Sequence, residues 1–116
     1  RYARAAFDRL RAEHLARDPR LQRGRAMAYW GAGRNTRQRA RLLIARGFPP
    51  AAWIDIDPDK IGQRVWGAPV HDRGWLAQEP RPFVLVYVTN HGARALITGW
   101  LAELGYAPGR DYLFVG

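Results

Sequence analysis

Hydrophobic residues along this chain fall into two kinds of segment that follow one another. Short, nearly continuous apolar runs predict five β-strands, at residues 26–30, 51–56, 65–70, 83–88 and 112–115. Apolar residues that recur every three or four positions predict helices at 2–17, 35–47 and 93–104, with a brief helical stretch at 72–78. Strands that alternate with helices predict an α/β fold with a mostly parallel sheet, because parallel strands need a crossover connection.

Individual residues set the ends and faces of these predicted helices. Pro19 ends the first helix, and Asn35 with Gln38 resembles a capping box, in which two side chains satisfy the first N–H groups of a helix. The apolar stripe of the first helix is predicted on Ala3, Phe7, Leu10 and His14. The stripe of the last helix is predicted on Ala93, Leu96, Ile97, Trp100, Leu101 and Leu104. All five tryptophans are expected in the core, namely Trp30, Trp53, Trp66, Trp75 and Trp100.

The first strand runs directly into Gly31-Ala32-Gly33 and then into a helix. This arrangement is typical of a Rossmann unit that holds a nucleotide. The glycines turn the chain tightly and let the backbone approach a diphosphate, whose charge meets free N–H groups and the positive end of the helix dipole. Thr36 stands where the dinucleotide pattern has its third glycine, and a β-branched residue there pushes the helix away or shifts the diphosphate.

Acidic and polar residues follow the other predicted strands. Asp55 and Asp57 end the second strand, where a carboxylate accepts hydrogen bonds from a ribose. We predict a three-layer Rossmann-like fold with strand order 3-2-1-4-5, in which a crevice opens between the first and fourth strands beside 31–35 and 89–92. The predicted nucleotide-binding residues are Gly31, Gly33, Arg34, Asn35, Thr36, Asp55, Asp57, Thr89, Asn90 and His91.

Two of these segments also permit other chemistry. Asp55-Ile56-Asp57 has the D-x-D pattern by which many glycosyltransferases hold a metal, but its place at a strand end before Pro58 favours ribose binding and a turn, so we predict no metal site. His91 is a candidate acid or base. No partner carboxylate can be identified for it, and Asn90 beside it is an ordinary helix cap, so we predict no catalytic residue.

Composition narrows the possible functions. The 116 residues suffice for one domain, which we divide into a connector helix with its linker at 1–24 and a Rossmann-like domain at 25–116. Because the chain starts at Arg1, we expect a fragment of a longer protein. The absence of cysteine and serine excludes disulfides, thiolate metal sites and both thiol and serine nucleophiles, and agrees with a cytoplasmic location. No apolar run approaches the roughly 20 residues of a membrane span.

The formal net charge of +9 comes almost entirely from arginine, since Lys60 is the only lysine. A basic balance suits nucleic acid, an anionic membrane surface or a phosphorylated ligand. Arginine is spread through every predicted helix instead of forming one tract, and no nucleic-acid-binding motif accompanies it. We therefore expect no specific nucleic-acid partner.

Four segments together resemble a known family: 29–34, 53–62, 67–70 and 109–115. They are similar to the C-terminal Rossmann-like domain of bacterial family 2 glycosyltransferases and, more distantly, to the N-terminal nucleotide-sugar-binding domain of sialic-acid-type O-acyltransferases. The resemblance implies an accessory domain whose partner is the catalytic domain of a parent glycosyltransferase. The chain lacks the Q-x-x-R-W acceptor motif of that catalytic domain, so we expect no sugar transfer by this part alone.

Two other functions stay open at this stage. One is a fragment of an NAD(P)-dependent oxidoreductase, although the sequence has no Tyr-x-x-x-Lys pair or other group for hydride transfer. The other is a purely structural assembly module, for which the aromatic edge of the leading helix is suited. The candidate ligands are accordingly a nucleotide sugar or NAD(P).

Overall fold

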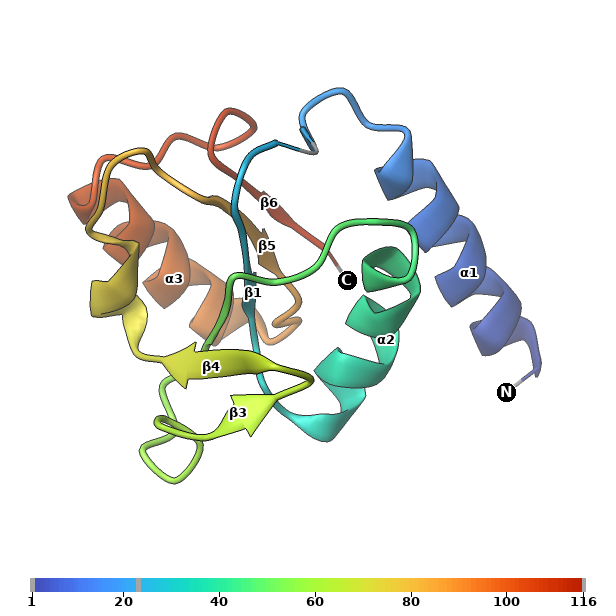
Figure 1. Ribbon diagram of the computed structural model, residues 1–116, viewed down its shortest axis with the longest axis horizontal. Coiled ribbons are helices and arrows are strands. Elements are labelled where there is room, and N and C mark those ends of the chain that lie inside the picture. The colour runs from blue at the N-terminus through green and yellow to red at the C-terminus, as the bar shows by residue number, and fades with distance from the viewer. Residues whose placement is uncertain (1, 23, 116) are drawn as a thin grey trace.

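The computed structural model describes residues 2–22 and 24–115 of the chain. Its ten helices and strands follow in the order α1 (Tyr2–Ala16), β1 (Met27–Trp30), α2 (Arg34–Ile44), β2 (Ala52–Ile54), β3 (Arg64–Val65), β4 (Ala68–His71), the 3-10 helix η1 (Arg73–Leu76), β5 (Phe83–Val86), α3 (His91–Glu103) and β6 (Tyr112–Phe114). The strands form one sheet in the order β3-β4-β2-β1-β5-β6. Helices α1 and α2 cover one face, and α3 with η1 covers the other (Figure 1).

The sheet confirms the predicted α/β Rossmann-like fold. Strands β4, β2, β1, β5 and β6 pair in parallel and keep the predicted order of five strands. Successive residues of the central strand face opposite layers, because side chains alternate along a strand. Tyr29 lies in the core beneath α2 with Leu43, whereas Trp30 lies in the core beneath α3 with Leu101. The sheet therefore has a separate apolar core on each face.

The predicted third strand is wrong in one respect, because residues 65–70 fold back on themselves. Strand β3 pairs antiparallel with β4 and adds a sixth strand at the edge of the sheet. Trp66 and Gly67, which join them, have φ angles of 50° and 82°. Two consecutive positive φ angles are typical of the two-residue turn that closes a hairpin. Trp66 is consequently 51% exposed, so its predicted place in the core is also wrong.

The predicted apolar stripe of the first helix is wrong as well. Phe7 and Leu10 are 55% and 64% exposed, and His14 is exposed too, while the side chain of Ala3 lies outside the described residues. The buried residue is Ala12, with Leu15 and Ala16 partly buried against the core. An alanine at the contact lets the helix approach closely, and spacing alone favoured the larger side chains instead.

At the amino edge of the sheet, hydrogen bonds from charged side chains connect segments that are distant in sequence. Arg25 donates to Asp111 Oδ1 at 2.9 Å and to the carbonyls of Arg81 and Arg110 at 3.0 and 2.8 Å. The other oxygen of Asp111 accepts hydrogen bonds from the Ala107 N–H and from Arg110. Burial raises the pKa of Asp111, but these hydrogen bonds outweigh it and lower the pKa to about 2.

Within the described part of the chain, none of the helices has the length and continuous apolar sequence needed to cross a membrane.

Candidate functional site

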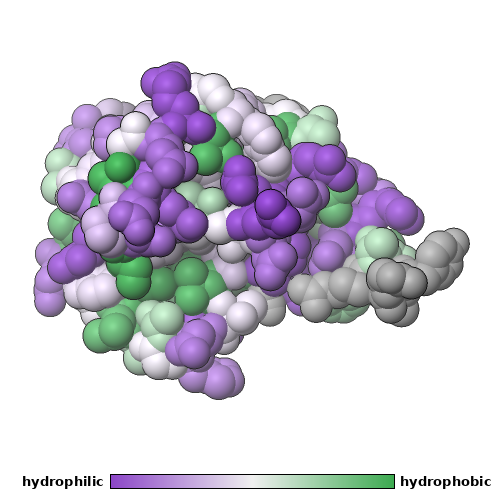
Figure 2. All heavy atoms as spheres, turned by 90° about the horizontal axis from the view of Figure 1, so that it is seen from below, coloured by the Kyte–Doolittle hydropathy of each residue, from purple (hydrophilic) through white to green (hydrophobic). Residues whose placement is uncertain are grey.

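The candidate site lies at the carboxyl edge of the sheet. From β1 the chain passes to α2 on one face, and from β5 it passes to α3 on the other (Figure 1). The two connections diverge between neighbouring parallel strands, which is where open α/β sheets bind their ligands. Figure 2 views the molecule from this side and shows apolar side chains gathered within a largely hydrophilic surface.

The two glycines of the β1–α2 turn differ in what they require. Gly31 has a φ of 119°, and a Cβ there would lie 3.0 Å from both Oγ1 and Cγ2 of Thr36. The fold itself therefore needs glycine at position 31. Gly33 has an ordinary φ of −72°, and a Cβ there would meet no atom within 4 Å. No atom of the described protein excludes a side chain at position 33, where glycine is also a favourable N-cap, whereas a ligand that approaches the backbone closely would exclude one.

Helix α2 begins without a side-chain cap. Its N-cap is Gly33, which has no side chain to accept a hydrogen bond, and its first turn contains no acidic residue. The predicted capping box at Asn35 is wrong, because the tight turn starts the helix earlier and places Asn35 inside the first turn. Helix α3 does have the predicted cap, since Asn90 Oδ1 accepts from the Ala93 N–H at 3.0 Å. The positive end of α2 is therefore open to an anion.

Asp55 connects the end of β2 to the glycine turn. Its Oδ2 accepts from the Ala32 N–H at 2.9 Å, and its Oδ1 accepts from the Asp57 N–H at 3.0 Å. Each carboxylate oxygen has a second lone pair, so Asp55 retains acceptor capacity for a ribose hydroxyl. Asp57 instead accepts from the Asp59 N–H and lies 3.9 Å from the Lys60 ammonium. Asp57 therefore stabilises the turn at residues 57–60.

An apolar cleft of about 230 Å³ opens between this turn and α3. Ile56 and Lys60, which follow β2, line it on one side, and Leu96 and Ile97 of α3 line it on the other. Ile56 and Leu96 are 61% and 58% exposed, although both are large apolar residues. Walls of this kind suit a flat aromatic group such as a nucleobase.

Two tryptophans lie along the inner wall of the apolar cleft. The Trp30 and Trp100 rings stack with their centroids 6.2 Å apart and their planes 6° apart, and the Arg73 guanidinium lies 4.0 Å from the Trp100 ring centroid. Trp30 is only 2% exposed. It therefore packs in the core, as predicted for it, and Trp53 is buried as well. Trp75 and Trp100 are half-buried.

A second, polar hollow of about 800 Å³ opens on the α2 side of the same edge. Asn35, Gln38 and Arg39 of α2 line it, together with Thr89 and Asn90 after β5. The apolar cleft and the polar hollow share Thr36 and Val88 as lining residues. The two spaces are therefore neighbours, separated near the start of α2.

The structure brings most of the predicted site residues together. Those that line the apolar cleft are Gly31, Gly33, Thr36 and Asp55. Those that line the polar hollow are Asn35, Thr36, Thr89 and Asn90. Three described residues, Arg34, Asp57 and His91, line neither space. No group of three or more His, Asp or Glu side chains within residues 2–22 and 24–115 is placed to hold a metal ion.

Sequence reasoning missed Ile56, Leu96, Lys60 and Asp8 as lining residues. Position in the chain gave a signal for Ile56 and Lys60, because Ile56 directly follows Asp55 and Lys60 lies in the turn that comes after it. The helical spacing of Leu96 predicts a core position, which is wrong, and only its exposure in the structure indicates a surface role. Asp8 comes from α1, outside the strand-turn-helix unit, so local sequence contained no signal for it.

No protein-family model matches this chain, and no curated protein matches its sequence. Solved structures do match. UDP-D-quinovosamine 4-dehydrogenase from Vibrio fischeri is similar with a TM-score of 0.65 and 23% identity, over 79% of this chain and 78% of that chain. RSP, a Rex-family repressor, is similar with a TM-score of 0.61 and 16% identity, over 81% of this chain and 47% of that chain.

RSP in complex with β-NAD+ and operator DNA gives a TM-score of 0.59 at 16% identity, over 78% of this chain and 49% of that one. The chain thus spans about half the length of these repressor chains. At such identities the likeness concerns the fold alone. The domain has the Rossmann-like α/β fold.

Proposed function

We propose that the carboxyl edge of the sheet binds a nucleoside diphosphate ligand, with the diphosphate over Gly33 at the start of α2. The observation that carries this proposal is the open space at Gly33, where a Cβ would meet no atom within 4 Å, in front of a helix without a side-chain cap. Free backbone N–H groups and the helix dipole stabilise a diphosphate at such a position. Arg34, which is exposed beside it, adds long-range positive charge.

The remainder of the nucleoside fits the surroundings of that turn. The base would lie between Ile56 and Leu96 in the apolar cleft, which removes both exposed apolar side chains from water. The ribose would lie beside Asp55, whose two oxygens already accept one hydrogen bond each and can accept another. A carboxylate there also disfavours a 2′-phosphate, so NAD is a better ligand than NADP.

The similar structures support a dinucleotide of the NAD type as the first ligand to test. RSP was solved with β-NAD+ and with β-NADH, and the similar Vibrio fischeri protein is named as a dehydrogenase of a UDP-sugar. This likeness favours a fragment of an NAD-dependent oxidoreductase over the glycosyltransferase accessory domain. Because the sequence has no Tyr-x-x-x-Lys pair, the proposal concerns binding and includes no hydride transfer by this chain alone.

The glycosyltransferase relationship stays a prediction of the sequence. It requires a family 2 catalytic domain in the same parent chain, with this domain as its accessory. Sequencing the coding region on both sides of this segment tests it directly. A dehydrogenase substrate domain in that position would contradict it.

Calorimetric titration with ADP, NAD and UDP tests the proposed site. We expect the unmodified protein to bind ADP or NAD at micromolar to millimolar concentration and Gly33→Val to weaken binding at least 100-fold, about 2.7 kcal/mol, because the branched side chain occupies the place of the phosphate. The matched control is Gly24→Val at the opposite edge, since a Cβ at Gly24 also meets no atom within 4 Å. Failure of all three ligands to bind at millimolar concentration, or equal binding by Gly33→Val, would contradict the proposal.

A further inference from the structure

The polar hollow contains a residue from outside the nucleotide-binding unit. Asp8 of α1 lines it together with α2 and the segment after β5. Helix α1 lies beside α2 with Ala12 buried and Leu15 partly buried against the core, and its ion pair between Glu13 and Arg46, 3.2 Å apart, is a partly exposed surface contact. The α1 helix therefore places a carboxylate at the carboxyl edge of the sheet, in the hollow that Asn35 and Thr36 of α2 also line.

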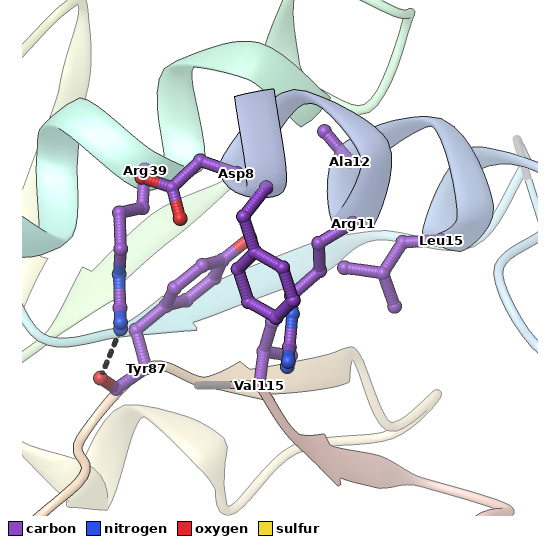
Figure 3. A pocket seen from close by; sticks show the side chains of 8 residues that line it. Asp8, Arg11, Ala12, Leu15, Arg39, Tyr87 and Val115 are labelled. Carbon is purple, nitrogen blue, oxygen red and sulfur yellow. Dashed lines mark hydrogen bonds between the residues drawn. The ribbon is translucent and has the colours of Figure 1, made fainter. Parts of the chain in front are cut away.

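The surroundings of Asp8 are held in place by the protein itself. Figure 3 shows Asp8 and Arg39 facing each other from the two helices, with Tyr87 below them. Arg39 donates to the Tyr87 carbonyl at 2.7 Å, and its guanidinium carbon lies 5.3 Å from the Tyr87 ring centroid. These three residues also line a small cavity of about 90 Å³ beneath α1. These contacts hold the Arg39 side chain in place on the side of the polar hollow that faces Asp8.

The chemical character of the polar hollow differs from that of the apolar cleft. Its side chains are amides, hydroxyls, a guanidinium and a carboxylate, with Val88 and Tyr87 as the apolar contribution. Hydroxyl groups of a sugar ring both donate and accept hydrogen bonds, so they pair with carboxylates and amides alike. A nucleobase, in contrast, needs apolar walls above and below it, which the cleft supplies. The hollow is therefore suited to a polyhydroxyl ring.

We infer that the polar hollow binds the ring on the distal phosphate of the nucleoside diphosphate, a ribosyl or glycosyl group, and that Asp8 accepts hydrogen bonds from its hydroxyls. This inference rests on the proposed function, because the diphosphate over Gly33 connects the two spaces. Thr36 and Val88 line both of them, so a ligand that leaves the cleft past the start of α2 enters the hollow. The ligand class is a nucleoside diphosphate bearing a ribosyl or glycosyl group.

Titrations with pairs of ligands that differ by the group on the distal phosphate test this inference. ADP is compared with ADP-ribose and NAD, and UDP with UDP-glucose, by calorimetry. We expect ADP-ribose, or UDP-glucose if the ring is a hexose, to bind about 10-fold more tightly than its parent diphosphate. Asp8→Ala should remove most of this gain and leave ADP affinity unchanged, while Asp8→Asn, which retains an acceptor oxygen, should keep part of it. Glu13→Ala, a carboxylate change on the same helix outside the hollow, should keep all of it.

Three results would overturn the inference. Equal affinity for each diphosphate with and without its ring, in a protein that binds ADP, would mean that the hollow takes no ring and would leave the proposed function intact. An equal loss of ADP and ADP-ribose affinity in Asp8→Ala would mean that Asp8 acts only by holding α1. Absence of any binding would overturn the proposed function and this inference together.

Discussion

At the amino edge of the sheet, Arg25 and Asp111 hold each other and three neighbouring backbone groups, whereas at the carboxyl edge α2 starts without a side-chain cap. Each edge belongs to the same parallel strands, so the fold alone does not explain the difference. Buried polar groups normally find a partner within the protein, and the amino edge follows this rule. The carboxyl edge instead exposes Ile56 and Leu96 to water.

This contrast separates stability from binding within one small domain. Exposed apolar residues and an uncapped helix cost stability, and proteins retain such features where function requires them. We therefore expect changes at the amino edge to lower the free energy of unfolding and to leave ligand affinity alone. Changes at the carboxyl edge should mainly affect affinity. The following predictions test this separation.

Asp111→Ala should have the largest effect on stability. Breaking a buried ion pair by removing one partner leaves the other charge uncompensated and costs about 3 to 5 kcal/mol. Urea unfolding measures the loss, and Glu13→Ala serves as the control, because its ion pair with Arg46 is more exposed and should contribute less than about 1 kcal/mol. An equal loss in the two variants would contradict the role given to the amino edge. ADP affinity of folded Asp111→Ala should stay within twofold.

Lowering the pH should weaken the ion pair between Arg25 and Asp111, with a smaller loss of unfolding free energy than Asp111→Ala causes. The pKa of Asp111 is about 2 in the folded protein and 3.8 when unperturbed, so the folded state favours the ionised form. Its contribution is therefore complete above pH 4 and is lost as the pH falls from about 4 to 2, by about 2 kcal/mol. The difference in unfolding free energy between the unmodified protein and Asp111→Asn, followed over this pH range, isolates the contribution of the ionised Asp111 side chain. A difference independent of pH would contradict the ion-pair account.

The two glycines of the turn should lose different amounts of stability on the same substitution. Gly31→Ala should lower the unfolding free energy by about 1 to 2 kcal/mol, because its φ of 119° is strained for alanine and its Cβ meets Thr36. Gly33→Ala should lower it less, by about 0.5 kcal/mol, because its Cβ meets nothing and only the preference of an N-cap for glycine over alanine is lost. Thermal unfolding compares them. Equal destabilisation would mean that Gly33 serves the fold and not a ligand.

Much of the fold could be predicted because it depends on local pattern. The continuous run at 83–88 indicated a strand buried on both faces, and β5 lies fully buried between β1 and β6. The order of the five parallel strands followed from the alternation of strands and helices. The hairpin at Trp66 and Gly67 did not, because an apolar run interrupted by one glycine has the same composition whether it continues or turns back.

The candidate site was predictable only where one strand-turn-helix unit supplies it. The glycine turn and Asp55 follow from a short sequence with fixed spacing, and the structure brings them to one edge. The contribution of Asp8 depends on which face of α1 packs on α2. That face is selected by the small side chain of Ala12, which spacing does not reveal. Contacts between elements distant in sequence thus decide what local patterns leave open.

Backbone amide NMR shifts during titration with ADP test the central claim most directly, because both edges are observed in one experiment. We expect saturable shifts at Gly33, Arg34 and Asn35 around the proposed diphosphate position, together with Ile56 and Leu96 in the cleft. The amides of Arg25 and Asp111 at the amino edge should stay unchanged. Absence of shifts at millimolar ADP, or saturable shifts centred on the amino edge, would contradict the assignment of the carboxyl edge as the ligand site.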